Sequence, residues 1–193
     1  MTKRTYALLM ATTLLAGCAS DPSINVTHHV PHGSTLGVVM FEDCQIAKQT
    51  DCDGSGANAS AIFVRVLSER PGLHAVSVPR PVGAKASYSD DAAIAYGKAK
   101  GYRYIVNGEV QDYSRTGHIG LRANRASVAV RVLNTSNGLT IATYTYQEDS
   151  KTHLTSTDAM LEDMAKQLAA SIIVVPKKDR EGNFLFYKGK NSG

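Results

Sequence analysis

The spacing of apolar positions predicts alternating strands and helices. Residues 35–42 form a short apolar run rich in β-formers, which is typical of a strand buried on both faces, and residues 73–78 indicate a second strand. Between them, apolar side chains recur at three- and four-residue steps up to about residue 70, which predicts an amphipathic helix with Ser55 as its N-cap. A second helix is expected from its N-cap Ser89 to Gly101, with acidic residues in its first turn and lysines in its last.

The second half predicts three consecutive strands and a last helix. Residues 102–113 alternate apolar and polar side chains, and residues 127–133 place their valines on one side. Residues 139–147 follow an Asn-Gly turn, which favours antiparallel pairing with the preceding strand. A helix over residues 157–172 has one apolar stripe that would pack on the sheet. The order β-α-β-α-β-β-β-α therefore predicts an α/β (α+β) domain with a mixed sheet.

Composition agrees with an ordinary globular domain. Of the 193 residues, 43% are hydrophobic, 20% are charged and none is tryptophan, so Val, Ile, Leu and Ala must form the core. A domain of this size buries roughly 70% of the surface of its unfolded chain, so it requires neither a metal nor many disulfides. The net charge of +4 is modest for nucleic-acid binding, and no nucleic-acid partner is expected.

The amino-terminal residues predict a lipoprotein signal. Two basic residues precede an apolar run over residues 6–15, which is well short of the ~20 residues that a spanning helix needs. The sequence Leu-Ala-Gly-Cys at residues 15–18 follows directly and resembles the lipobox of bacterial lipoproteins. This resemblance implies that residues 1–17 are removed and that Cys18 is acylated with diacylglycerol and palmitate.

The residues after Cys18 imply a location. In the sorting rule known for such lipoproteins, an Asp after the cysteine favours the inner membrane, whereas Ala19 and Ser20 stand here. The resemblance thus implies a periplasm-facing anchor in the outer membrane. Residues 18–34 contain two prolines and little apolar periodicity, which predicts a lipidated tether whose last 15 residues reach roughly 50 Å. Residues 35–176 would form one periplasmic domain, and residues 177–193 a basic tail.

Two cysteines remain once Cys18 is acylated. The periplasm is oxidising, so a disulfide between Cys44 and Cys52 is expected. Their spacing is not Cys-x-x-Cys, and no second pair completes a zinc site. The bridge would shape a loop rather than hold the fold together.

The segment around Gly101 resembles a group of envelope proteins. It is similar to the strand that follows a helix in the curli-secretion lipoprotein, the penicillin-binding-protein activator lipoprotein and the TolB amino-terminal domain. The residues that match this strand are Gly101, Tyr104, Ile105, Val106, Gly108 and Val110. The hairpin over residues 128–146 follows the same scheme, and the resemblance covers about residues 36–172. The long membrane-spanning hairpins of the curli channel have no counterpart in the sequence.

No motif for catalysis, a cofactor or a metal stands out. The glycines of residues 54–56 lack the Lys-Ser or Lys-Thr of a phosphate loop, and the histidines outside the tether stand singly. We therefore expect no enzyme, no cofactor and no metal site. In the basic tail, cations surround apolar residues, and this pattern marks either a partner contact or an edge strand. The candidate partner contacts are Phe184, Phe186, Tyr187 and Lys188.

These observations favour a non-enzymatic, lipid-anchored interaction or assembly module of the outer membrane. Its partners would be the membrane, through the anchor, and an envelope protein or further copies of itself. Two alternatives stay open: an envelope hydrolase acting on cell-wall or lipid material, and a carrier of a small apolar or anionic ligand. Fold alone does not decide between them.

Overall fold

A computed structural model describes residues 21–115, 123–150, 154–173, 177–178 and 184–185. These residues form a six-stranded sheet, three α-helices, a short 3-10 turn and a separate two-stranded sheet. The strands are β1 (Ser23–Val26), β2 (Ser34–Val39), β3 (Leu73–Val78), β4 (Tyr104–Ser114), β5 (Asn124–Asn134), β6 (Leu139–Ser150), β7 (Lys177–Lys178) and β8 (Phe184–Leu185). The helices are α1 (Ser55–Glu69), α2 (Asp90–Ala99) and α3 (Thr157–Ile172), and the 3-10 turn is η1 (Thr50–Cys52).

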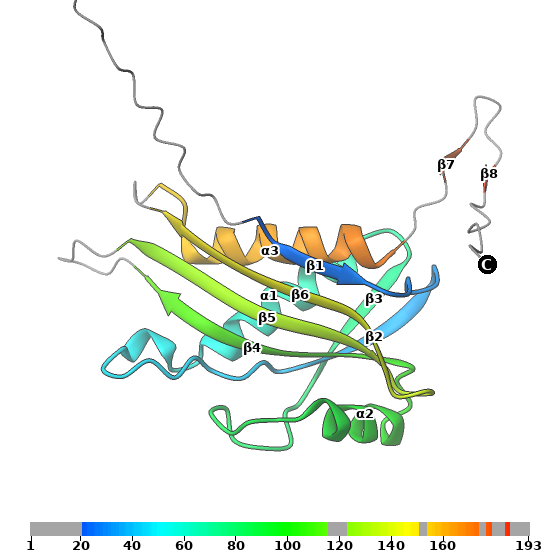
Figure 1. The fold of residues 1–193 in the computed structure, drawn as a ribbon, viewed down its shortest axis with the longest axis horizontal. Helices are drawn as coiled ribbons and strands as arrows, with labels where there is room; N and C mark the ends of the chain where they lie inside the picture. Colours follow the sequence, from blue (N-terminus) through cyan, green and yellow to red (C-terminus); the bar gives the residue numbers. More distant parts are fainter. Residues whose placement is uncertain (1–20, 116–122, 151–153, 174–176, 179–183, 186–193) are drawn as a thin grey trace, which may run out of the picture.

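The large sheet is mixed, with strand order β1-β6-β5-β4-β2-β3. Strand β2 pairs in parallel with β3 and β4, whereas β4, β5, β6 and β1 pair antiparallel in succession. The predicted α/β class is confirmed, and the predicted elements occur in the expected order. Strands β1 and β3 form the two edges (Figure 1).

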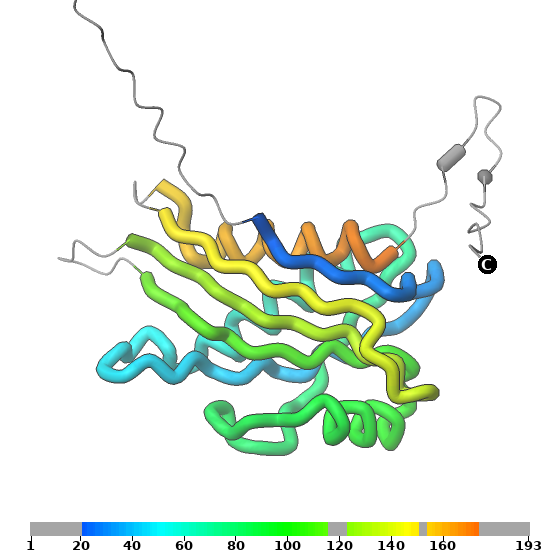
Figure 2. Tube along the Cα trace, viewed as in Figure 1, coloured from blue at the N-terminus to red at the C-terminus, as the bar shows by residue number. Residues whose placement is uncertain are grey.

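The helices pack on both faces of the sheet. Helices α1 and α3 pack against each other on one face, while α2 packs on the other face over β4 and β5 (Figures 1 and 2). The larger core lies beneath α1 and α3, where the rings of Phe41 and Phe63 meet edge to face at 5.2 Å. The smaller core lies beneath α2 and contains Val39, Tyr88, Ala93, Ile105 and Leu133.

Local signals position α2 and the hairpin as expected. The Ser89 hydroxyl accepts a hydrogen bond from the Ala92 amide at 3.2 Å, so Ser89 is the N-cap of α2. Gly101 follows the helix with φ +80°, a conformation that glycine adopts without steric cost. Gly138 has φ +75° in the turn between β5 and β6, as expected, whereas Asn137 lacks the positive φ that an Asn-Gly hairpin turn predicts.

The predicted tether over residues 18–34 differs from the structure. Ser23–Val26 form β1 and pair with β6, with Ser23 opposite Thr145. Val30 is buried, and its amide donates to the Ile172 carbonyl at 2.7 Å. The prediction was wrong for this segment because four residues of alternation between two prolines give a weak strand signal. The sheet therefore begins five residue steps after Cys18.

The tail is described only in part. Strand β7 pairs antiparallel with β8, with Lys178 opposite Phe184, in a sheet separate from the large one. Phe186, Tyr187 and Lys188 lie outside the described residues, as does Cys18, so their roles stay predictions. Among the helices that the structure describes, none is long and apolar enough to cross a membrane.

Candidate functional site

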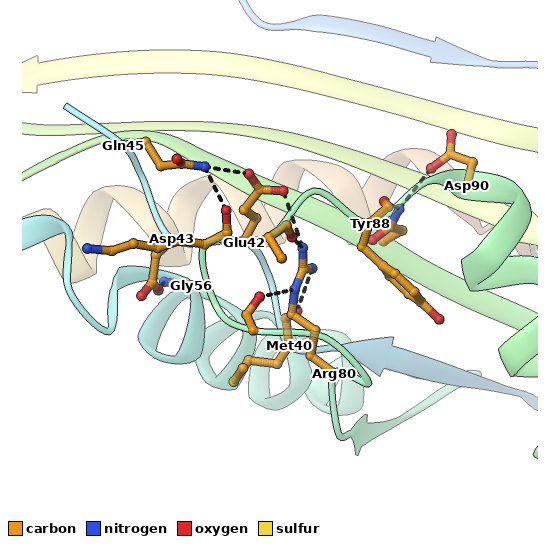
Figure 3. A network of polar contacts seen from close by, with 12 residues as sticks. Met40, Glu42, Asp43, Gln45, Gly56, Arg80, Tyr88 and Asp90 are labelled. Carbon is orange, nitrogen blue, oxygen red and sulfur yellow. Dashed lines mark hydrogen bonds and ion pairs between the residues drawn. The ribbon is translucent and has the colours of Figure 1, made fainter.

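The first candidate site lies at the carboxyl ends of the parallel strands, where open α/β sheets usually bind ligands. Strands β2 and β3 end side by side, and Glu42 and Arg80 follow them closely in the sequence. Arg80 Nη2 lies 3.2 Å from Glu42 Oε2, and the two side chains are only 1% and 15% exposed (Figure 3). The carboxyl ends of β2 and β3 therefore lie beside a buried ion pair.

The Arg80 guanidinium also donates hydrogen bonds to three backbone carbonyls. Its Nη1 donates to the Met40 carbonyl and its Nε to the Gly83 carbonyl, both at 3.3 Å, and its Nη2 also donates to the Ala86 carbonyl. The Tyr88 ring centroid lies 5.4 Å from the guanidinium carbon, within cation–π range. Arg80 thus fastens the loop after β3 to the end of β2.

A second carboxylate at this edge caps α1. Asp43 is 5% exposed, and its oxygens accept hydrogen bonds from the Gly54 amide at 3.0 Å and the Gly56 amide at 2.7 Å. A carboxylate at a helix amino terminus is favoured by the helix dipole. Ser55, predicted to be the cap, instead accepts from the Cys44 amide at 3.1 Å. That prediction was wrong because the capping residue lies outside the local sequence pattern.

Cys44 and Cys52 form a disulfide within the capped loop, with 4.9 Å between their Cα atoms. Replacing both with serine should lower the free energy of unfolding by about 2.5 kcal/mol, since the bridge closes a short loop in the unfolded chain. Urea denaturation of the oxidised protein and of the double variant measures this difference. A variant as stable as the parent would contradict a stabilising role for the bridge.

A polar contact on the other face joins α2 to the sheet. Asn107 Nδ2 donates to the Tyr88 carbonyl at 3.0 Å and to Asp90 Oδ1 at 2.9 Å. Arg131 Nε lies 2.8 Å from the same Asp90 oxygen. These polar side chains on β4 and β5 therefore hold the first turn of α2.

The second candidate site is a cluster of four residues, Asn58, Tyr113, Arg115 and Asp158. Asn58 Nδ2 donates to the Tyr113 hydroxyl at 3.0 Å and to Asp158 Oδ1 at 2.9 Å, and the Tyr113 hydroxyl lies 3.2 Å from the same carboxylate. Arg115 Nη2 lies 3.3 Å from Asp158 Oδ1. The cluster ties the first turns of α1 and α3 to the end of β4.

Burial raises the pKa of Tyr113 to about 12; Asp158 adds to the rise, and the Arg115 cation opposes it. The phenol therefore stays protonated far above neutral pH. A group with such a pKa is poorly matched to general-base work near pH 7. The hydrogen bonds of the cluster are those of a structural tie between elements.

This pKa predicts a loss of stability in alkali. Tyr113 ionises at about pH 10 in the unfolded chain but at about 12 in the folded protein, so its contribution is complete below pH 10 and is lost as the pH rises through 12. The unfolding free energy of a Tyr113→Phe variant should therefore fall less steeply between pH 10 and 12. Denaturation curves at several pH values test this, and equal slopes would contradict it.

The sequence analysis did not predict that Asp43, Arg80 and Tyr113 link separate segments of the fold. A signal existed for Asp43, which is a charged residue between the predicted strand of residues 35–42 and a cysteine. Arg80 stands between two prolines, a context that carries no pattern of its own. In the part of the chain that the structure describes, no group of three or more His, Cys, Asp or Glu side chains could hold a metal ion.

Comparison with known proteins identifies the fold. The chain is similar to PelC from Paraburkholderia phytofirmans, whose structures are dodecamers. One PelC structure matches at 12% identity and a TM-score of 0.60, covering 80% of this chain and 99% of that chain. A second matches at 13% identity and a TM-score of 0.57, covering 77% and 94%. At these identities the likeness shows a shared fold alone. No protein-family model matches the chain, and no curated protein sequence does so.

Weaker matches include envelope proteins. Lipoprotein GNA1162 from Neisseria meningitidis matches at 13% identity with a TM-score of 0.43, covering 72% of this chain and 99% of that one. The LpoB C-terminal domain from Salmonella enterica matches at 13% identity with a TM-score of 0.35, covering 63% and 85%. These scores carry no argument about function. The resemblance to the group of envelope proteins inferred from the sequence stays a prediction.

Proposed function

We propose that this protein is a non-enzymatic, lipid-anchored assembly module that faces the periplasm from the outer membrane. The observation that carries the proposal is that the polar side chains at the carboxyl ends of β2 and β3 are bonded to the protein itself. Arg80 and Glu42 bond to each other there, and Arg80 also donates hydrogen bonds to the backbone carbonyls of Met40 and Gly83. Side chains at this edge thus stabilise the fold instead of facing a substrate.

Self-assembly is the interaction that we propose. Support comes from PelC, which forms a dodecamer and has this fold over 80% of the present chain. Further support comes from the face of the sheet on which α2 packs over β4 and β5 (Figure 1). Beyond α2, this face continues over β6, where Thr143, Thr145 and Gln147 are exposed. Short polar side chains on such a face can hydrogen-bond to another chain.

Cross-linking in cells tests the proposal. The full-length protein is treated with a short amine-reactive cross-linker, and its adducts are sized on denaturing gels, with Cys18→Ser as the control. We expect a ladder at multiples of the chain mass from the membrane fraction, and release of the Cys18→Ser protein from that fraction. Single chains alone, recovered equally from soluble and membrane fractions in both strains, would overturn it.

A further inference from the structure

The position of β1 limits how far the domain can lie from its anchor. Five residue steps separate Cys18 from Ser23, and an extended chain of that length spans at most about 18 Å. The 12 residues of β6 alone span roughly 36 Å. If Cys18 is acylated, the start of β1 must therefore lie within about 18 Å of the bilayer, and this distance is shorter than the sheet.

The pairing of the strands shows from which end of the sheet the chain enters β1. Ser23 lies opposite Thr145 at the middle of β6, and because β1 runs antiparallel to β6, the residues that lead into β1 approach it from the carboxyl end of β6. At that end Asn124 lies opposite Ser150, and Asn124 Nδ2 donates to the Thr155 carbonyl at 2.9 Å. The segment that leads into α3 therefore lies at the end of the sheet where β6 ends (Figure 2).

The loop before η1 also lies at this end. Ile46 and Lys48 line a hollow of about 350 Å³ together with Ser114 and Arg125, which are paired residues at the ends of β4 and β5. Lys48 is exposed and has φ +66°, which is uncommon for a residue other than glycine. The loop thus presents a cation beside an exposed isoleucine.

Two large apolar side chains are exposed here. Leu154 is 88% exposed and Ile46 is 38% exposed. Leu154 is the most exposed of the large hydrophobic residues that the structure describes. Apolar side chains together with a cation match the boundary between lipid head groups and acyl chains, where the apolar part is buried and the charge stays in water.

We propose that this end of the domain, defined by Ile46, Lys48 and Leu154 and here called the anchor end, rests on the lipid bilayer. The alternative is a domain lying on its side with β1 against the membrane. That orientation would turn the unpaired backbone groups of an edge strand towards lipid, where they find no hydrogen-bond partners. The anchor end instead offers side chains. The inference rests on the lipid anchor of the proposed function.

The lack of tryptophan in the chain makes the test direct. Leu154→Trp places a single fluorophore at the anchor end, and Leu139→Trp is its matched control, since Leu139 is 50% exposed at the opposite end of β6. Each full-length lipidated variant is reconstituted into phosphatidylethanolamine and phosphatidylglycerol vesicles, with and without brominated acyl chains. Bromine quenches only fluorophores near the acyl region.

We expect Leu154→Trp to lose emission in brominated vesicles and to emit at shorter wavelength than in detergent, while Leu139→Trp changes little. Equal quenching at both positions would show a domain lying on its side and would overturn the inference, as would quenching at neither. Mass spectrometry of the amino-terminal peptide separates the two proposals. An unmodified Cys18 overturns both, whereas an acylated Cys18 with an unquenched Leu154→Trp overturns this inference alone.

Discussion

Replacing Arg80 by leucine should lower the free energy of unfolding by about 3–5 kcal/mol, because the change leaves the buried Glu42 carboxylate without its cation. The Met40 and Gly83 carbonyls would also lose a donor. Urea denaturation followed by far-ultraviolet circular dichroism measures the loss. The expected effect is large because the Arg80 side chain is 1% exposed, so water cannot replace the missing bonds.

Arg65→Leu is the matched control for this prediction. Arg65 also lies within bonding distance of two carboxylates, at 3.0 Å from Glu69 and 2.7 Å from Glu162, but its side chain is 49% exposed. Water and salt screen such pairs, so this variant should be nearly as stable as the parent. An equal loss of unfolding free energy in both leucine variants would show that burial of the Arg80–Glu42 pair does not add to stability.

Replacing Gly56 by alanine should destabilise the protein by about 3 kcal/mol, the reverse of the usual effect inside a helix. A Cβ atom at Gly56 would lie 2.1 Å from the Phe41 carbonyl oxygen and 2.7 Å from its carbon. These are backbone atoms of the segment just after β2, so they cannot rotate away. The Gly56 amide would also be pushed from the Asp43 carboxylate that caps α1.

Gly83→Ala serves as the control for backbone crowding. A Cβ atom there would meet nothing within 4 Å, and Gly83 does not have a positive φ. This variant should be unchanged or slightly more stable, because alanine restricts the unfolded chain. The melting temperatures of the two variants give the comparison. An equally stable Gly56→Ala protein would show that the close packing of α1 against the end of β2 is not required.

Local sequence patterns were sufficient to predict an element when its start, its faces and its end are all marked by nearby residues. Helix α2 has its cap at Ser89, acidic residues in its first turn and Gly101 after its end, and the structure places it there. The hairpin between β5 and β6 follows in the same way from Asn137 and Gly138. Such elements are predictable because the determining contacts lie within a few residues of each other.

The candidate site was not predictable in this way because its contacts join distant segments. Asp43 caps a helix whose first amides are 11 and 13 residues further along, and Arg80 reaches Glu42 across 38 residues. Strand β1 was missed for a related reason, since its pairing partner in β6 is more than a hundred residues away. Short segments gain their structure from such partners rather than from their own propensity.

The polar contacts at the carboxyl ends of β2 and β3 also support the proposed function. The ends of β2 and β3, the cap of α1 and the loop before α2 are held by one set of polar side chains (Figure 3). Buried polar networks whose groups are all satisfied favour a rigid, specific structure. A rigid domain is suited to assembly, because little conformational freedom is lost when copies associate.

Native mass spectrometry of the full-length protein, extracted from membranes in mild detergent, tests the central claim most directly. One spectrum reports both how many chains travel together and what each chain carries at its first residue. We predict a closed oligomer of identical chains, each beginning at an acylated Cys18. A single chain that retains residues 1–17 and carries no lipid would contradict the account.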